Sequence, residues 1–491
     1  MHDDHQLIEG RLLRTLQRIE DAVWSSPVDV DLASWEAPGE PVPVSEGLAA
    51  LYEPAHVGQR WGAPWGTTWF RVRAQVPEAH AGRPVDLRLD LGFDPDRTGF
   101  HVEGLVYRVD GTPVKGLNPR NQWVRVTDAA QGGEVVELFV EAASNPLLLG
   151  GGGFDFRPSP LGDPETAGRE PGYRVERAEL AVFEQEVWEL QQDLEVLGQL
   201  ALELPLEDAR RWQVLRALDR AIDRLDVAEL AATASDARGE LEDVLAAPAR
   251  ASAHRISAVG HAHIDSAWLW PVRETVRKVA RTCSNVVALM DDHPELVYAM
   301  SSAQQFAWLK EHRPEVWAGV VDRVREGRFV PVGGMWVESD TNMPGGEALA
   351  RQLNHGKRFF LDEFGIETRE VWLPDSFGYN AALPQLVALS GSRWFLTQKI
   401  SWNTTNRFPH HSFRWEGLDG TRVFTHFPPA DTYNSQLSGA EVAHAARNFS
   451  DKGAATRSLL PFGWGDGGGG PTREMLARAA RLRDLDGSAR V

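Results

Sequence analysis

Two histidines and an aspartate occupy alternate positions at the end of one apolar segment. In the run Gly-His-Ala-His-Ile-Asp these side chains are His261, His263 and Asp265. Side chains two positions apart on a strand point to the same face, so the three groups can converge on one point. Imidazole nitrogen and carboxylate oxygen are ligands of divalent cations such as zinc. A polar strand end that only caps loops is the alternative, but two histidines and an aspartate on one face favour a metal site.

Carboxylates also follow two other apolar segments. Asp375 comes directly after the run Val-Trp-Leu-Pro, and taken by itself it suits the N-cap of a helix. Glu338 and Asp340 follow a pair of glycines and lie close to Trp336 in the chain. Two glycines permit a close backbone approach. These two acids therefore either contact sugar hydroxyls or are solvated on the surface, and the sequence leaves both open.

A fourth carboxylate, Asp466, precedes the glycine run 467–470. A glycine loop at a helix N-terminus can bind phosphate. Here the Gly-Lys-Ser/Thr ending of a P-loop is missing and Pro471 removes a backbone donor, which disfavours nucleotide binding. Asp466 is then either a second catalytic carboxyl or an ordinary turn residue. His426, near the end of a hairpin expected over 414–427, is likewise either a site residue or a surface histidine.

Alternating strands and helices must position these groups. From about residue 254 the chain changes repeatedly from strand to loop to helix. This order is typical of a largely parallel sheet or an α/β barrel, in which functional groups gather at the carboxyl ends of the strands. The strands are expected at 255–263, 328–333, 370–374, 393–398 and 459–463, and helices at 275–291, 347–364 and 383–389.

The front half predicts two further units. Apolar residues at helical spacing over 7–24 indicate an amphipathic helix, which a loop over 27–64 follows. Alternating strands between about 66 and 185 predict a β-sandwich, and helical spacing returns over 186–247. We therefore expect a multidomain chain with an N-terminal helix and linker, a β-sandwich-like domain, a helical linker and a C-terminally incomplete α/β catalytic domain, at 1–39, 40–185, 186–253 and 254–491.

Composition excludes several classes of partner. The 491 residues carry a net charge of −19, which argues against nucleic acid and anionic membranes. Cys283 is the one cysteine, so no intrachain disulfide forms, and a cytoplasmic setting is expected. The N-terminus lacks the pattern of a signal peptide, and no run of 18 apolar residues indicates a membrane span.

In their order and spacing, the motifs resemble those of the α-mannosidases of glycoside hydrolase family 38. His263-Ile264-Asp265 followed by Trp268 is similar to the family's His-x-Asp-x-x-Trp zinc motif. Asp375-Ser376-Phe377-Gly378 resembles its Asp-Pro-Phe-Gly segment, with Ser376 in place of the usual Pro and Tyr379 in place of the usual His. The resemblance is close over 254–485.

The segments around Trp336, His426 and Asp466 resemble more specifically the cytosolic and vacuolar branch of the family. That branch also carries a β-rich N-terminal extension, as residues 40–185 are expected to form. This branch supports the cytoplasmic location.

The resemblance implies a zinc-dependent retaining α-mannosidase that hydrolyses terminal α-mannosides, in glycan and oligosaccharide catabolism, through a covalent glycosyl-enzyme intermediate. Asp375 would be both nucleophile and metal ligand, with His263 and Asp265 as further ligands and Asp466 as the acid/base. The family's fourth ligand is a histidine, expected beyond residue 491. The chain is therefore expected to be an N-terminal fragment with little activity alone.

The substrate contacts are expected from aromatic and polar side chains beside these carboxylates. They are Trp268, Asp340, Phe377 and His426. The partner is an α-mannoside oligosaccharide. Homo-oligomers are common in the family and stay open for this chain, as does the choice between zinc and another divalent metal.

Two other interpretations compete with the α-mannosidase. The pair His261-x-His263 is also the arrangement of amidohydrolase-like metal hydrolases. That class needs further histidines after later strands, whereas His293, His312 and His355 fall in helical regions. The second alternative is a fragment that binds sugar without catalysis. Only the amidohydrolase-like centre needs His261 as a metal ligand; in the α-mannosidase this histidine is expected to orient the site from behind the metal ligands.

Overall fold

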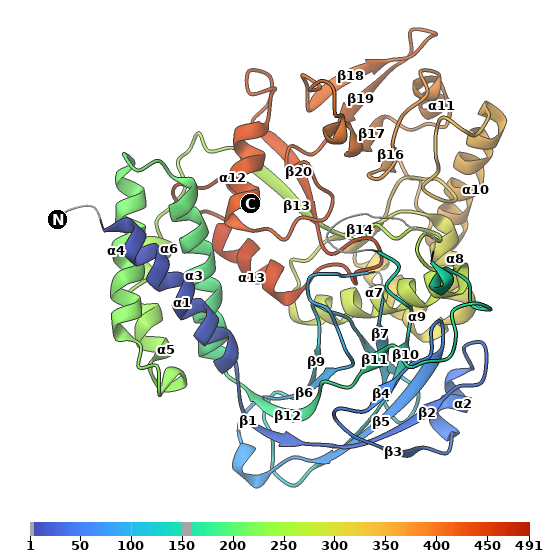
Figure 1. Cartoon of the computed structure of the whole chain (residues 1–491). Helices are drawn as coiled ribbons and strands as arrows, with labels where there is room; N and C mark the ends of the chain where they lie inside the picture. The colour runs from blue at the N-terminus through green and yellow to red at the C-terminus, as the bar shows by residue number, and fades with distance from the viewer. Residues whose placement is uncertain (1–3, 100, 150–158) are drawn as a thin grey trace.

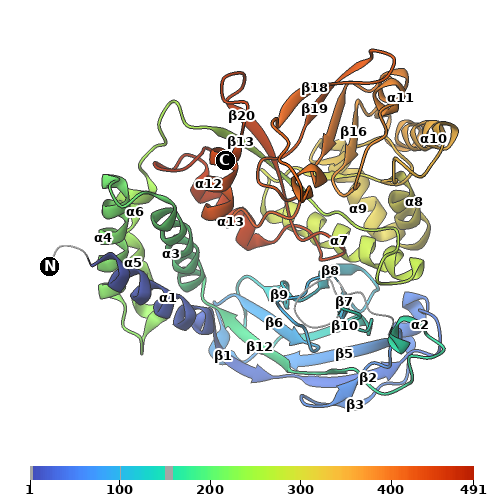
Figure 2. The ribbon, with the colours of Figure 1, turned by 45° about the horizontal axis from the view of Figure 1, so that its top comes forward.

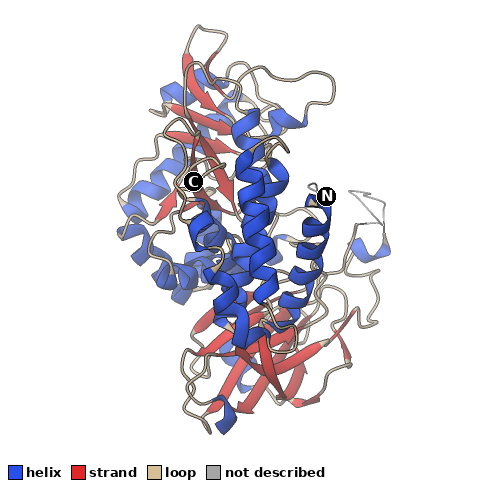
Figure 3. Ribbon diagram, turned by 90° about the vertical axis from the view of Figure 1, so that its left-hand side faces the viewer, coloured by secondary structure: helices blue, strands red, loops and turns tan. Residues whose placement is uncertain are grey.

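The computed structural model describes residues 4–99, 101–149 and 159–491 and divides them into three parts. A helical bundle lies on the left of Figure 1, a β-sandwich at the bottom and an α/β part at the upper right. The turned views show the sandwich strands and the α/β strands at opposite ends, with helices between them (Figures 2 and 3). Within the described ranges, no helix combines the length and apolarity needed to span a bilayer.

The sandwich domain, residues 24–183, packs two main antiparallel sheets face to face. One has the order β1-β12-β6-β9 and the other β3-β2-β5-β10-β7-β8, while β4 and β11 form a separate pair. The strands and the helix α2 have these bounds: β1 (Trp24–Asp29), β2 (Asp31–Glu36), α2 (Val44–Ala49), β3 (Glu53–Ala55), β4 (Arg60–Trp61), β5 (Thr67–Gln75), β6 (Val85–Asp90), β7 (Glu103–Tyr107), β8 (Pro113–Leu117), β9 (Trp123–Thr127), β10 (Val135–Ala143), β11 (Tyr173–Arg174) and β12 (Arg177–Phe183).

Alternating apolar residues build the core of this domain, as the sequence predicts. Val72 of β5, Leu87 of β6 and Val140 of β10 are fully buried in one cluster between the sheets. Each such side chain stabilises the fold by about 1.5–3 kcal/mol. The loop expected over 27–64 is a correction, because β2 and β3 extend the larger sheet there. The edge strand β3 and its neighbour β2 bury little, so they lack a clear alternation.

The helical bundle surrounds one long central helix, α3. Leu190, Leu194 and Leu197 of α3 are buried, as their spacing predicts. On its other side, α3 contacts the α/β part, where Arg481 forms a 2.6 Å ion pair with Asp193. The bundle comprises α1 (His5–Ala22), α3 (Gln185–Glu203), α4 (Ala209–Arg224), α5 (Leu230–Gly239) and α6 (Glu242–Leu245).

The α/β part alternates strands and helices, as predicted. Its elements are β13 (Arg255–His261), α7 (Val272–Asp292), β14 (Tyr298–Met300), α8 (Ala303–His312), α9 (Pro314–Arg325), β15 (Phe329–Pro331), α10 (Gly346–Phe364), β16 (Glu370–Leu373), α11 (Leu383–Leu389), β17 (Trp394–Thr397), the 3₁₀ turn η3 (Lys399–Trp402), β18 (Ser412–Glu416), β19 (Arg422–His426), α12 (Gly439–Asn448), β20 (Arg457–Phe462) and α13 (Arg473–Leu482).

These strands form two sheets, β15-β14-β13-β20 and β16-β17-β19-β18, which are parallel except for β18. A small apolar cluster, including Val332, Trp372 and Leu396, contains residues of both sheets. The ladders of the described strands do not join into a closed barrel; at β20, Phe462 instead forms an isolated bridge with Ser435 in the loop after β19. The expected α/β order is thus present, while a closed barrel is not formed among the described strands. The carboxyl ends of β13, β16 and β20 lead into the candidate site.

Candidate active site

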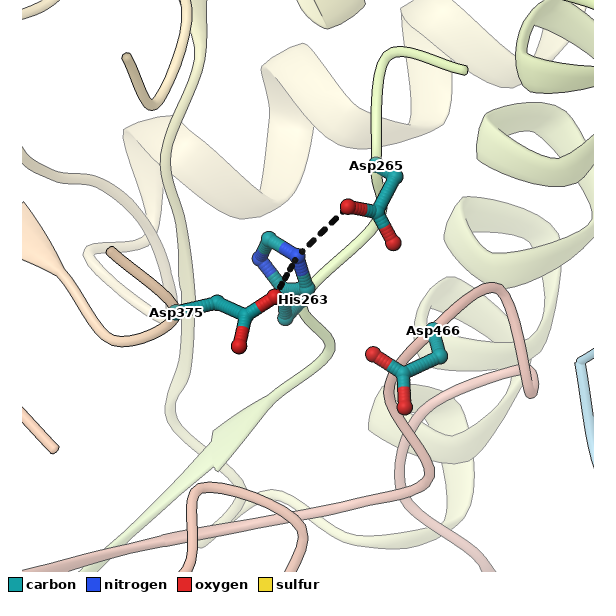
Figure 4. A group of neighbouring side chains, drawn as sticks. All are labelled: His263, Asp265, Asp375 and Asp466. Atoms are coloured by element: carbon teal, nitrogen blue, oxygen red, sulfur yellow. Dashed lines mark ion pairs between the residues drawn. The ribbon is translucent and has the colours of Figure 1, made fainter. Parts of the chain in front are cut away.

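His263 is the centre of a cluster of acidic side chains. Its Nε2 atom lies 3.3 Å from Oδ1 of Asp265 and 3.1 Å from Oδ2 of Asp375 (Figure 4). Asp466 faces the same space, and all four residues offer one ligand atom within 4.8 Å of each of the others. The structure therefore brings His263, Asp265 and Asp375 together, as the sequence predicts, and adds Asp466.

Strand ends bring these residues together. His263 and Asp265 follow β13, Asp375 follows β16 and Asp466 follows β20. β13 and β20 are neighbours in one parallel sheet, so their carboxyl ends lie side by side, and the end of β16 in the second sheet brings Asp375 to the same space. Asp466 has a φ of +54°, a left-handed conformation that costs a non-glycine residue about 1 kcal/mol or more and persists only where neighbours hold it.

Glu338 orients the imidazole of His263. The Nδ1 atom of His263 lies 2.7 Å from Oε2 of Glu338, and the hydroxyl of Ser301 binds the other oxygen of that carboxylate. The backbone N–H of Glu338 donates to the hydroxyl of Ser302 at 3.0 Å. A carboxylate on Nδ1 fixes the tautomer that presents Nε2 to the cluster. The sequence shows a carboxylate at position 338, but it does not show that this group contacts His263.

Lys399 and Tyr433 complete the polar surroundings, and sequence reasoning missed both roles. The Nζ atom of Lys399 forms a 2.7 Å ion pair with Oδ1 of Asp375 and lies 3.4 Å from the ring centre of Trp402. The hydroxyl of Tyr433 donates to Oδ1 of Asp466 at 3.0 Å. Lys399 lies in a 3₁₀ turn and Tyr433 in a loop, where no periodicity indicates the direction of a side chain.

These neighbours push the pKa values of two carboxyls apart. Burial would raise the pKa of Asp375, but His263 and Lys399 lower it below its usual value. Burial raises the pKa of Asp466 to about 6, with help from the negative charges of Asp265 and Asp375. Burial opposes protonation of His263, but the surrounding carboxylates, Glu338 first, raise its pKa well above the usual range. Asp375 is thus kept ionised, whereas Asp466 holds its proton more readily.

His261 does not join the cluster, although it is two residues from His263. Its ring is fully buried, Nδ1 lies 3.0 Å from the carbonyl oxygen of Ala299, and burial lowers its pKa. An amidohydrolase-like centre would need both histidines as ligands of the same metal. The geometry therefore disfavours that alternative.

Two predicted substrate contacts, His426 and Asp340, make hydrogen bonds within the chain. The Nδ1 atom of His426 lies 2.9 Å from the hydroxyl of Ser412, and Nε2 accepts the backbone N–H of Leu459 at 3.1 Å. Both ring nitrogens are therefore engaged, and His426 links the two sheets beside a cavity of about 520 Å³. Asp340 accepts the backbone N–H of Asn342 at 2.8 Å, the bond of a turn residue.

Exposed aromatic rings belong to the segments around the cluster. Trp268 is 38% exposed and Phe377 71% exposed, and both were predicted as sugar contacts. Trp402, which sequence reasoning missed, is 51% exposed and lies edge-on to Phe377 with ring centres 6.0 Å apart. Exposed apolar faces of this kind suit stacking against a sugar ring.

Comparison with known families identifies the class of the chain. Residues 253–491 match the family described as "Glycosyl hydrolases family 38 N-terminal domain". Residues 27–181 match "Alpha-mannosidase, jelly roll domain", which corresponds to the sandwich domain. The chain therefore contains the N-terminal domain of glycosyl hydrolase family 38, preceded by an α-mannosidase jelly roll domain.

Named relatives agree with these matches. The chain is 43% identical to alpha-mannosidase 2C1 of Homo sapiens over 471 residues, which cover 95% of this chain and 43% of the relative. It is 34% identical to alpha-mannosidase G of Dictyostelium discoideum, covering 92% of this chain and 40% of the relative. It is also 34% identical to an alpha-mannosidase of Saccharomyces cerevisiae, covering 89% and 40%. The chain thus spans less than half the length of these relatives.

Proposed function

We propose that this chain supplies the catalytic centre of a zinc-dependent retaining α-mannosidase. The observation that carries the proposal is the convergence of one imidazole and three carboxylates from three strand ends within 4.8 Å. The family match and the named relatives support the sugar specificity. Hydrolysis of terminal α-mannosides in oligosaccharides, in the cytoplasm, follows as part of the same proposal.

The cluster fits a divalent cation. Nε2 of His263 and Oδ2 of Asp265 are buried and make no hydrogen bond of good geometry. Nitrogen and oxygen donors with three carboxylates suit zinc or a similar divalent metal. We propose His263, Asp265 and Asp375 as the ligands, with Glu338 behind the imidazole. A cation held by these residues would supply Lewis-acid stabilisation of the charge that develops on the sugar.

Two carboxyls suit the two catalytic roles. Asp375, whose pKa is lowered, would attack the anomeric carbon and form the glycosyl-enzyme. Asp466, whose pKa is raised to about 6, would give its proton to the departing glycosidic oxygen. It would then take a proton from the water that attacks the anomeric carbon and releases Asp375. Retaining enzymes place these carboxyls about 5–5.5 Å apart and inverting ones about 6.5–9.5 Å apart. Ligand atoms within 4.8 Å of each other favour the retaining geometry.

The surrounding side chains would hold the sugar and the nucleophile. Lys399 would keep the carboxylate of Asp375 ionised and fix its direction through the 2.7 Å pair. The exposed rings of Trp268, Phe377 and Trp402 would cover an apolar face of the sugar and exclude water. A contact between Asp340 and sugar hydroxyls stays a prediction.

Covalent trapping tests this proposal directly. A mannosyl fluoride with a second fluorine on the ring forms the intermediate faster than it hydrolyses, so even a slow enzyme accumulates label. After incubation with zinc, mass spectrometry should show one added sugar on the peptide that contains Asp375, and none in Asp375→Ala. Label on another residue would refute the nucleophile. Mannose binding by calorimetry without any label would favour a non-catalytic sugar-binding chain.

A further inference from the structure

The glycine run 467–470 admits close neighbours. A Cβ atom on Gly467 would lie 2.7 Å from Cδ of Lys278, and one on Gly469 would lie 2.3 Å from Nδ2 of Asn118. Real Cβ atoms do not approach heavy atoms so closely, so a side chain at either position would displace the loop. Lys278 belongs to α7, whereas Asn118 belongs to the sandwich domain. The glycines after Asp466 therefore allow another domain to touch the catalytic loop.

The sandwich domain also meets Asp466 itself, backbone against backbone. Gly99 lies in the loop between β6 and β7 and has a φ of +89°. A Cβ atom on Gly99 would lie only 2.2 Å from the carbonyl oxygen of Asp466. The preceding residue, Thr98, lies against Gly468, whose added Cβ would be 3.2 Å from the Cβ of Thr98. The Thr98–Gly99 turn thus packs directly against the loop that carries Asp466.

A buried lysine fixes this turn to α7. The ammonium group of Lys278 donates to the carbonyl oxygen of Gly99 at 2.8 Å and pairs with Oε1 of Glu103 at 2.7 Å. Arg281, one turn further along α7, pairs with the other oxygen of Glu103 at 2.6 Å. These side chains are almost completely buried, so water does not screen the pairs. The turn therefore cannot move away from Asp466 without breaking buried charged contacts.

The opposite side of the Asp466 loop is held within the α/β part. Tyr433 donates to the carboxylate of Asp466, and the side-chain oxygen of Asn434 accepts the backbone N–H of Gly465 at 3.1 Å. Asp466 keeps its strained φ between this support and the Thr98–Gly99 turn. The loop is clamped from two sides, and one side belongs to a different domain.

We propose that the sandwich domain is part of the active site: its Thr98–Gly99 turn, locked by Lys278, positions the loop and thereby the carboxyl of Asp466. This proposal rests on the proposed role of Asp466 as the acid/base. Gly99 and Lys278 are positioning residues, because they act through the Asp466 loop. Their loss should therefore impair proton donation more than sugar binding.

Two matched glycine variants test the proposal. Gly99→Ala places a methyl group against the backbone of Asp466, whereas Gly82→Ala, in the same domain at a φ of +76°, meets nothing within 4 Å. Amide hydrogen–deuterium exchange is measured by mass spectrometry over 463–470. In this segment the backbone N–H of Trp464 and that of Gly470 each donate to the carbonyl oxygen of the other residue at 2.9 Å. We expect Gly99→Ala to speed exchange there at least ~10-fold and Gly82→Ala to change it less than ~2-fold. Lys278→Met, which keeps an unbranched side chain, should act like Gly99→Ala.

A kinetic readout separates positioning from a general loss of structure. Gly99→Ala should lower kcat/KM at least ~10-fold more for methyl α-mannoside than for dinitrophenyl α-mannoside, since only the former needs a proton. KM should change little. Equal losses for both substrates, or unchanged exchange in folded Gly99→Ala and Lys278→Met, would overturn the proposal. If the unmodified chain turns over neither substrate, the covalent label on Asp375 decides the proposed function, and the exchange comparison decides by itself whether the turn holds the loop.

Discussion

Glu338→Gln should weaken zinc binding without unfolding the chain. The substitution keeps the shape of the side chain but removes the negative charge 2.7 Å from Nδ1 of His263. The side chains of both residues are shielded, with 5% and 11% exposed, so solvent replaces little of the lost interaction. Loss of a carboxylate behind a ligating histidine typically lowers metal affinity ~10–100-fold. That change corresponds to about 1.4–2.7 kcal/mol.

Titration calorimetry with zinc chloride, in competition with a chelator of known affinity, measures this change at constant pH. The control is Glu347→Gln, which removes an equal charge from a side chain that is 79% exposed and pairs with Arg351 on the surface of α10. Its zinc affinity should stay within ~2-fold, since exposed pairs contribute little. Unchanged affinity in folded Glu338→Gln would refute the reasoning, as would an equal loss in both variants.

Three further outcomes follow from the same contacts. Asp466→Asn should lower kcat/KM ~10²–10⁴-fold for aryl mannosides with poor leaving groups and spare those with good ones; a uniform loss would contradict its role as the acid. Burial lowers the pKa of His426 to about 4, below its unfolded value of about 6.5. Between these two pH values the unfolded chain binds more protons than the folded chain. The free energy of unfolding, measured with urea, should therefore fall by up to about 3 kcal/mol as the pH drops from about 6.5 to about 4. In His426→Asn it should fall less. Glu141→Gln should lower the free energy of unfolding by about 3–5 kcal/mol, because Glu141 is buried and pairs with Arg277 at 3.1 Å and Arg313 at 3.3 Å. A change under about 1 kcal/mol would show that these buried ion pairs do not stabilise the fold.

Much of the fold could be predicted because its periodicity is strong. Apolar residues alternate with polar ones from Phe70 to Gln75 of β5 and recur at helical spacing in α3, so both elements could be predicted. β14 was missed, since its residues Tyr298–Met300 are too few to show any period and all are buried. β2 was missed for the opposite reason: it buries Leu32 alone, so no alternation marks it as a strand.

The site was predictable where strand ends fix directions. The spacing of His263 and Asp265 after one strand sufficed to place these two on one face, whereas Asp375 was joined to them by the resemblance of its segment to the family motif. Tyr433 and Lys399 reach the site from irregular segments, whose paths depend on tertiary contacts that no local pattern encodes. The bonds of His426 to Ser412 and Leu459 could not be predicted, because a histidine at the end of a hairpin gives no sign of which neighbouring strand its ring will contact.

Zinc-edge anomalous diffraction from crystals soaked in zinc would locate the cation itself. We expect one strong peak per chain, bonded to Nε2 of His263 and to carboxylate oxygens of Asp265 and Asp375, and no peak in Asp375→Ala at the same zinc concentration. A principal peak on His261, or one away from these strand ends, would contradict this expectation.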